Sequence, residues 1–208
     1  GIPPAFMRDE NGVAFWGGIS FMKAGISLAD GVSTVSPSYA AEICTPEGGF
    51  GLDGLLRFRR RRLAGILNGI DTATWNPLTD PLLPANYGAR GLQRKDACRA
   101  ALSEGAGVDG SGTLLGMVTR LAHQKGIDLL LTALPGLLER GCSLVVLGHG
   151  DGHYEQALRA AAAHRPDRLA VHTGFADELA HLVYAGSDLF LMPSLYEPCG
   201  LGQMIAQR

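Results

Sequence analysis

The feature that most constrains the fold is an alternation of short apolar runs with helical patterns in the second half of the chain. The apolar runs cover residues 114–118, 144–147, 169–172 and 188–192. A helical pattern separates each run from the next. Strands that alternate with helices in this way form parallel sheets covered by helices on both faces, so we predict an α/β fold.

The helical patterns have clear ends. One helix is predicted to begin near Gln124 and to stop at Gly141, because glycine is common just past a helix end. It presents one apolar face, made of Ile127, Leu130, Leu131, Leu134 and Leu138. A second helix is predicted for residues 154–164, and Asp177 is predicted to cap a third. The glycines of residues 148–152 predict a turn before the second helix.

The first half of the chain gives a more broken pattern. It predicts helices near residues 19–29, from Pro37 onward and near residues 52–62, with strands at residues 32–35 and 66–67. Residues 71–91 contain three prolines, which predict an extended loop across the surface.

The composition excludes several classes of partner. Hydrophobic residues make up 46% and charged residues 18% of the 208 residues, as in ordinary soluble globular proteins. A net charge of −2 gives no electrostatic reason to expect binding to nucleic acid or to an anionic membrane. No uninterrupted apolar run is long enough to span a bilayer.

The cysteines and the chain ends carry further expectations. Cys44, Cys98, Cys142 and Cys199 lie far apart and form no C-x-x-C pair. This spacing favours unpaired thiols in a reducing compartment over a disulfide framework or a zinc site, so we expect a cytoplasmic protein without a metal centre. The chain opens without an initiator methionine and stops within a helical pattern, so we expect residues to be missing at both ends.

Candidate site residues follow several of the predicted strands. Arg120, Lys125, Phe175 and Glu197 all lie in loops after strands. Ligands of parallel sheets bind at the carboxyl ends of the strands, where these loops gather. The sequence therefore predicts one shared site.

Two cations lie between a predicted strand and the start of a helix. Arg120 and Lys125, next to free helix N–H groups, suit a diphosphate ligand. The alternative is a solvated loop with ordinary surface charges, because such pairs are common.

The segment around Glu197 gives a second candidate. Its glycines would let the backbone approach a ligand closely. The amides of Gly200, Leu201 and Gly202 would face outward at a helix N-terminus, where they suit an anion. The alternative is a helix entry in which Pro198 and Gly200 serve only the turn.

Other patterns favour structural roles. A G-x-G-x-G pattern at residues 148–152 lacks the third glycine of a dinucleotide fingerprint at the required spacing. His149 and His153 are four residues apart, but the glycines between them argue against a metal-binding helix face. The basic run at residues 57–62 is typical of a solvated helix face, and Cys199 has no neighbouring histidine that could make it a nucleophile.

Five segments of the sequence stand out together: GISFMKAG at residues 18–25, TVSPSYA at 34–40, LNGID at 67–71, TRLAHQKG at 119–126 and EPCGLGQ at 197–203. They resemble segments of the bacterial glycogen synthases and their plant starch synthase relatives. They run in that family's order and nearly at its spacing. Five ordered matches are far more specific than any single motif.

The resemblance implies a GT-B glycosyltransferase, in which two Rossmann-like domains face each other across a cleft. Residues 1–62 would be the last part of the N-terminal, acceptor-side domain. Residues 63–208 would be most of the donor-binding domain. The family's N-terminal lysine–glycine–glycine loop and its cleft histidine would lie upstream of Gly1.

The resemblance also implies the roles of site residues. Arg120 and Lys125 would bind the donor diphosphate and stabilise its charge as the bond to glucose breaks, and Glu197 would lie near the glucose ring. The implied donor-binding residues are Asn68, Phe175, Cys199, Gly200, Leu201 and Gly202. Phe175 aligns with a family tyrosine proposed to stack on adenine, and Gly202 replaces a family threonine.

The implied reaction moves glucose from ADP-glucose to the non-reducing end of an α-1,4-glucan such as glycogen, with retention at the anomeric carbon and with no cofactor or metal. Two alternatives stay open. In the first, the chain as given would be a catalytically silent fragment or a weak nucleotide-binding module, because half of the implied cleft is missing and positioning donor and acceptor together supplies much of the rate. Otherwise, the parent is a related GT-B transferase with another donor, such as UDP-glucose. The oligomeric state does not follow from the sequence.

Overall fold

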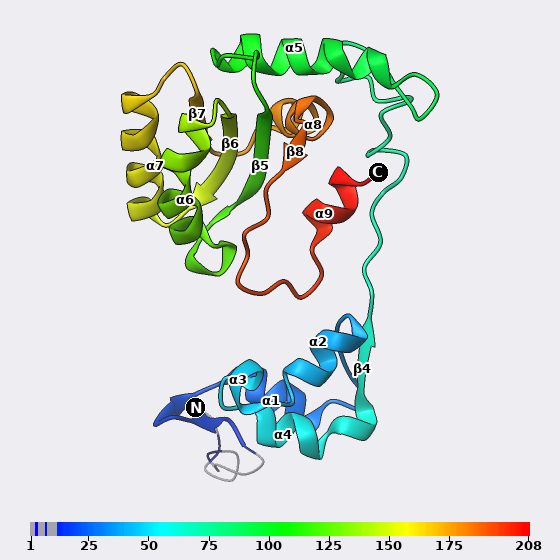
Figure 1. Ribbon diagram of the computed structural model, residues 1–208. Coiled ribbons are helices and arrows are strands. Elements are labelled where there is room, and N and C mark those ends of the chain that lie inside the picture. Colours follow the sequence, from blue (N-terminus) through cyan, green and yellow to red (C-terminus); the bar gives the residue numbers. More distant parts are fainter. Residues whose placement is uncertain (1–2, 4–6, 8–11) are drawn as a thin grey trace. The chain divides into compact units, whose positions relative to one another are not determined.

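The structure is a computed structural model that describes Pro3, Met7 and residues 12–208. The chain divides into two compact units, Gly1–Gly69 and Ile70–Arg208 (Figure 1). Each unit has its own sheet, and each is described by itself.

The second unit is built on a four-stranded parallel sheet. Its strands are β5 (Leu114–Leu121), β6 (Ser143–Gly150), β7 (Leu169–Thr173) and β8 (Leu189–Phe190), in the order β7-β6-β5-β8. β5 pairs with β6 along its whole length, from Leu114↔Ser143 to Leu121↔Gly150, and with β8 on its other edge. The predicted parallel sheet is confirmed.

Helices cover both faces of this sheet, as predicted. α6 (Ile127–Glu139) and α7 (Gly152–His164) pack on one face, where Leu115 and Met117 of β5 point. α5 (Lys95–Ala106) and α8 (Asp177–Gly186) pack on the other, where Leu114 and Val118 point. The apolar face predicted for α6 is buried at Ile127, Leu130, Leu134 and Leu138, with Leu131 partly buried against the same cluster.

The strand β6 extends further than predicted. Residues 148–150 were expected in a turn, but they continue the ladder to β5, with Gly148 opposite Thr119 and Gly150 opposite Leu121. A Cβ atom on Gly148 would lie 2.3 Å from the Thr119 carbonyl oxygen, and one on Gly150 would lie 2.2 Å from that of Leu121. The glycines therefore serve close strand packing as well as the turn that follows.

Two further predictions about helices need correction. The N-cap of α8 is Ala176, and Asp177 lies in the first turn, where its charge still favours the helix N-terminus. α5 was not predicted at all. Its buried residues are Cys98, Leu102 and Ser103, of which only Leu102 is a large apolar side chain.

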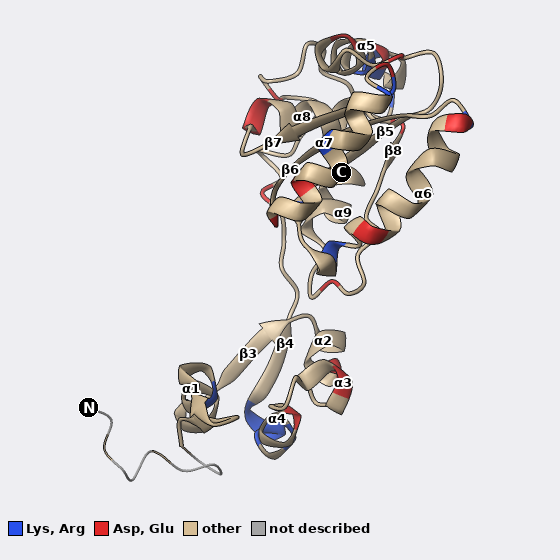
Figure 2. Cartoon of the chain, turned by 90° about the vertical axis from the view of Figure 1, so that its left-hand side faces the viewer, with Lys and Arg blue, Asp and Glu red and all other residues tan. Residues whose placement is uncertain are grey.

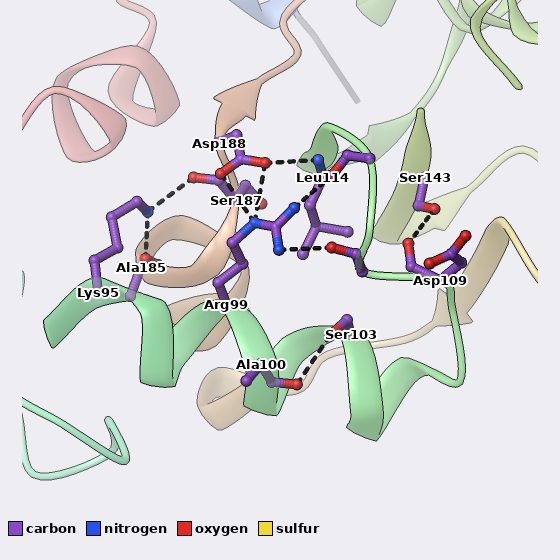
Figure 3. Close-up of polar contacts among 12 residues, drawn as sticks. Lys95, Arg99, Ala100, Ser103, Asp109, Leu114, Ser143, Ala185, Ser187 and Asp188 are labelled. Carbon is purple, nitrogen blue, oxygen red and sulfur yellow. Dashed lines mark hydrogen bonds and ion pairs between the residues drawn. The ribbon is translucent and has the colours of Figure 1, made fainter. Parts of the chain in front are cut away.

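A polar network joins α5 to the beginnings of β5 and β8 (Figure 3). The Arg99 guanidinium donates to both carboxylate oxygens of Asp188 at 3.1 Å and to the Gly110 carbonyl oxygen at 2.7 Å. Asp188 in turn accepts the Leu114 backbone N–H at 2.8 Å. Lys95 donates to the Ala185 carbonyl oxygen and, at 2.8 Å, to that of Ser187. The network fixes where two neighbouring strands begin.

Residues 71–91 contain no helix or strand, but they are firmly attached to α8. Asp80 is buried and bonds His181 Nδ1 at 2.6 Å. The Trp75 ring stacks on the His181 ring with 4.0 Å between centroids, and the Tyr87 hydroxyl donates to the Ala185 carbonyl oxygen at 3.2 Å. The segment therefore packs against α8 and is not a free loop.

The first unit has a two-stranded parallel sheet of β3 (Val32–Val35) and β4 (Leu63–Ile66). Around it lie α1 (Phe21–Leu28), α2 (Pro37–Glu42), α3 (Pro46–Gly49), α4 (Asp53–Phe58) and the 3-10 turn η2 (Arg60–Arg62), preceded by a hairpin of β1 (Ala14–Phe15) and β2 (Gly18–Ile19). Serine hydroxyls begin two of the helices: Ser20 accepts the Lys23 N–H, and Ser36 accepts the Tyr39 N–H. The basic run lies on α4 and η2, blue in Figure 2.

The position of β4 shifts the division between the two units. The sequence predicted a strand at residues 66–67 and placed residues 63–208 in the second domain. The strand instead starts at Leu63 and pairs with β3, so the first compact unit extends to Gly69 rather than to residue 62.

Candidate functional site

The strand order of the second unit creates a switch point beside β5. The chain proceeds from β5 to β6 and β7 on one side, then crosses to β8 on the other side. The loops that follow β5 and β8 therefore leave the sheet next to each other at the carboxyl ends of the strands. In open α/β sheets this is where ligands bind.

Backbone and side-chain bonds hold these two loops together. The loop after β5 forms the 3-10 turn η4 (His123–Lys125) before Gly126 starts α6. The Gln124 carbonyl oxygen accepts the Leu195 N–H at 2.9 Å, and the Gln124 side chain donates to the Tyr196 carbonyl oxygen at 3.1 Å. Segments about 70 residues apart in sequence are thus fastened side by side.

An ion pair links the two loops at the centre of the site. Lys125 Nζ lies 2.6 Å from Glu197 Oε1, and the two side chains are only 18% and 22% exposed. The Ser194 hydroxyl donates to the same Oε1 at 2.7 Å. Within the described part of the chain, no protein group donates to Oε2. That oxygen can accept a hydrogen bond from a ligand.

A hollow of about 460 Å³ opens between the two loops. It is lined by seven of the predicted site residues: Arg120, Lys125, Glu197, Cys199, Gly200, Leu201 and Gly202. Arg120 donates to Gln124 Oε1 at 3.1 Å. Gly200 has a φ of +75° and precedes α9 (Leu201–Ala206), so a glycine in the left-handed region makes the turn into that helix.

A second hollow of about 430 Å³ shares Val118, Thr119 and Arg120 with the first. Phe175 lies at this second hollow, two residues after the end of β7, and is 96% exposed. The structure thus places Phe175 next to the hollow that holds the cations rather than inside it. An exposed phenyl ring beside a cavity suits a flat ligand that stacks on it.

Sequence reasoning missed His149 as a site residue. It was considered only as a metal ligand with His153, but it lines the second hollow and lies 6.3 Å from Phe175 between ring centroids. His149 Nδ1 is 2.8 Å from Glu155 Oε1. Its position at the carboxyl end of a strand, between two glycines, was the available signal.

A polar cluster supports the start of α6 beside η4. Asp128 bonds the Tyr154 hydroxyl at 2.7 Å and His123 Nδ1 at 2.9 Å. Both hydrogen bonds lower the pKa of Asp128, and the bond from Tyr154 has the larger effect. The bond to Asp128 raises the pKa of Tyr154 to about 12, so its hydroxyl stays protonated as a donor at neutral pH.

The remaining predictions concern Asn68, metals and membranes. Asn68 belongs to the first unit and lines neither hollow. Among the described residues we find no group of three His, Cys, Asp or Glu side chains that could hold a metal ion. The described helices also include none long and apolar enough to cross a bilayer.

Family models match both units. A model of the starch synthase catalytic domain matches residues 1–58, and a model of group 1 glycosyl transferases matches residues 112–207. Glycogen synthases of Cellvibrio japonicus and Anaeromyxobacter dehalogenans are 53% and 54% identical over 100% of this chain. The chain covers 43% and 44% of these proteins, so it spans less than half the length of the curated relatives it matches.

A solved structure agrees with these matches. The catalytic domain of starch synthase IV from Arabidopsis thaliana, bound to ADP and acarbose, is 41% identical and superposes with a TM-score of 0.83. The alignment covers 88% of this chain and 38% of that one. The sequence matches, the fold and the order of the motifs agree, and the chain belongs to the family of glycogen and starch synthases, which are GT-B glycosyltransferases.

Proposed function

We propose that the whole protein transfers glucose from ADP-glucose to the non-reducing end of an α-1,4-glucan, with retention at the anomeric carbon. The observation that carries the proposal is the Lys125–Glu197 pair at the switch point, in one hollow with Arg120. A relative with 41% identity is bound to ADP and acarbose, which supports a nucleotide and a glucan as ligands.

The two cations would act on the donor diphosphate. Negative charge develops on the diphosphate as its bond to glucose breaks, and fixed cations in a partly buried site lower the barrier for that step. Lys125 is 18% exposed and is already positioned by Glu197. Arg120, bonded to Gln124, lines both hollows and so can reach a phosphate between them.

Glu197 and the glycine segment would hold the sugar. Glu197 Oε1 is taken by Lys125 and Ser194, which leaves Oε2 for a glucose hydroxyl. Gly200, Leu201, Gly202 and Cys199 would form the wall of the glucose and phosphate site. Phe175 would stack on the adenine ring, and Asn68 of the first unit would contribute to the donor site.

The proposal extends to domains, cofactors and location. The first unit would belong to the acceptor-side domain and the second to the donor-binding domain. The reaction would use ADP-glucose as a substrate and would need no cofactor or metal, because cationic side chains supply the charge stabilisation. A cytoplasmic location is supported by the four unpaired cysteines.

The test is a transfer assay on the full-length protein. With ADP-glucose and glycogen, we expect release of ADP and lengthening of the glucan chains. The same assay with UDP-glucose identifies the donor. No ADP release would contradict the proposed reaction, and faster turnover of UDP-glucose would reassign the donor.

Replacing Ser194 by alanine should weaken the binding of glucose more than that of the nucleotide. Glu197 would lose one of the two donors that orient it, so the KM for ADP-glucose should rise roughly fivefold, the effect of one hydrogen bond. Inhibition by ADP, which has no glucose, should stay unchanged. Steady-state kinetics measure both values.

Threonine at position 194 serves as the control, because Ser194→Thr keeps the hydroxyl and should restore most of the affinity. An equal loss of ADP and ADP-glucose binding in Ser194→Ala would show that the serine supports the loop in general and does not orient Glu197.

A further inference from the structure

The second hollow contains one side chain that the proposed function leaves without a role. His149 is the next-to-last residue of the strand β6, between Gly148 and Gly150, and lines the hollow together with Phe175. Its side chain is 59% exposed, so it does not serve the core. An exposed polar ring beside a stacking surface is placed to contact whatever stacks there.

The relative orientation of the two rings defines the contact. The Phe175 and His149 rings are 6.3 Å apart between centroids and tilted by 58°. A flat base that stacks on the Phe175 face would share its 58° tilt to the His149 ring, so it would not stack face to face on His149. Contacts to a base edge read its donors and acceptors, whereas contacts to its face do not.

The neighbouring carboxylate determines which ring nitrogen is free. Glu155 Oε1 accepts the Gly150 N–H at 3.1 Å and lies 2.8 Å from His149 Nδ1. Both hydrogen bonds lower the pKa of Glu155, and the bond from Gly150 has the larger effect. The Glu155 carboxylate therefore stays ionised and acts only as an acceptor. Nδ1 is therefore the donor to this carboxylate, which leaves Nε2 as the ring nitrogen that can accept a hydrogen bond from a ligand.

An acceptor at this edge distinguishes bases. Adenine carries an exocyclic amino group, which donates, whereas uracil carries a carbonyl oxygen at its corresponding edge. The carboxylate of Asp177, which also lines the hollow, is a second acceptor. These two acceptors favour the amino group and disfavour a carbonyl oxygen, since two acceptors cannot bond each other.

We propose that His149 is a specificity-determining residue of the donor site, which selects an amino-bearing purine through its free Nε2 while Phe175 supplies the stacking surface. This inference rests on the proposed function in that the second hollow receives the base of the donor nucleotide. The inference goes beyond the proposed function because it assigns the choice of base to one atom, Nε2 of His149.

The experiment compares nucleotides that differ in one group. Isothermal titration of the full-length protein with ADP and with inosine diphosphate, in which a carbonyl oxygen replaces the amino group, gives two dissociation constants. We expect wild type to prefer ADP, and His149→Ala to weaken ADP binding about fivefold, as expected for one hydrogen bond. Binding of inosine diphosphate and of inorganic pyrophosphate should change less than twofold.

Two further variants sharpen the result. His149→Phe keeps a ring but removes the nitrogen, so it should lose the preference for ADP just as His149→Ala does. His153→Ala is the matched control, because the His153 ring packs on Tyr154 and does not line the hollow. It should bind all ligands like wild type.

The outcomes separate this inference from the proposed function. An unchanged ratio of the ADP and inosine diphosphate constants in His149→Ala would overturn the inference, and so would an equal loss of pyrophosphate binding. Failure of the wild-type protein to transfer glucose, with the ratio still altered in His149→Ala, would overturn the proposed reaction but support the role of His149.

Discussion

Replacing Lys125 by alanine in the full-length protein is expected to lower kcat about 10²-fold or more, the usual effect of removing one group that stabilises transition-state charge. The cation would act most strongly when the diphosphate leaves, so kcat and kcat/KM should fall together. Its low exposure strengthens the effect, because water screens a partly buried charge only weakly. Steady-state release of ADP measures both constants.

Two controls separate catalysis from structure. Arg140→Ala removes a cation from the opposite end of α6 and should leave kcat unchanged. The double variant Lys125→Ala with Glu197→Gln removes both charges of the pair. If Lys125 served only to neutralise Glu197, the double variant would recover activity; we expect no recovery. A rise in KM at constant kcat would contradict the assigned role.

Replacing Gly126 by alanine should destabilise the second unit by roughly 3 kcal/mol, from a left-handed backbone and overpacking together. Gly126 has a φ of +67°, and a Cβ atom there would lie 2.0 Å from the Pro193 carbonyl oxygen. Pro193 belongs to the loop after β8, so the added methyl group would push the two site loops apart. Urea unfolding followed by circular dichroism measures the loss.

The matched control is Gly141→Ala at the other end of α6. Gly141 has a similar φ of +80°, but a Cβ atom there would meet nothing within 4 Å. It should therefore lose only the backbone contribution, roughly 1 kcal/mol. Equal unfolding midpoints for the two variants would show that the contact with Pro193 is relieved without cost.

The sequence predicted the sheet of the second unit well because its strands are apolar runs separated by amphipathic helices. Its errors have local causes. Glycines such as Gly148 and Gly150 are typical of a turn, yet both pair with β5 as part of β6. They are glycines in a strand because β5 packs too closely to allow side chains at these positions. The strand β4 alternates between half-buried and exposed residues over only four positions, too few for a clear period.

The sequence predicted the main residues of the candidate site but not all of the contacts between them. Motifs placed Arg120, Lys125 and Glu197 at strand ends, and the structure brings all three to one hollow. Their roles stay predictions. The bond from Ser194 to Glu197 and the contact of His149 with Phe175 depend on tertiary geometry, which spacing along the chain does not encode.

The two glycines of β6 also limit how this site can change. Positions 148 and 150 are closed to any side chain by the backbone of β5, whereas position 149 between them faces an open hollow. Of these three neighbouring positions, random mutagenesis will therefore find tolerated replacements at the middle one. A library built to alter nucleotide preference should concentrate its diversity at position 149 and leave its neighbours untouched.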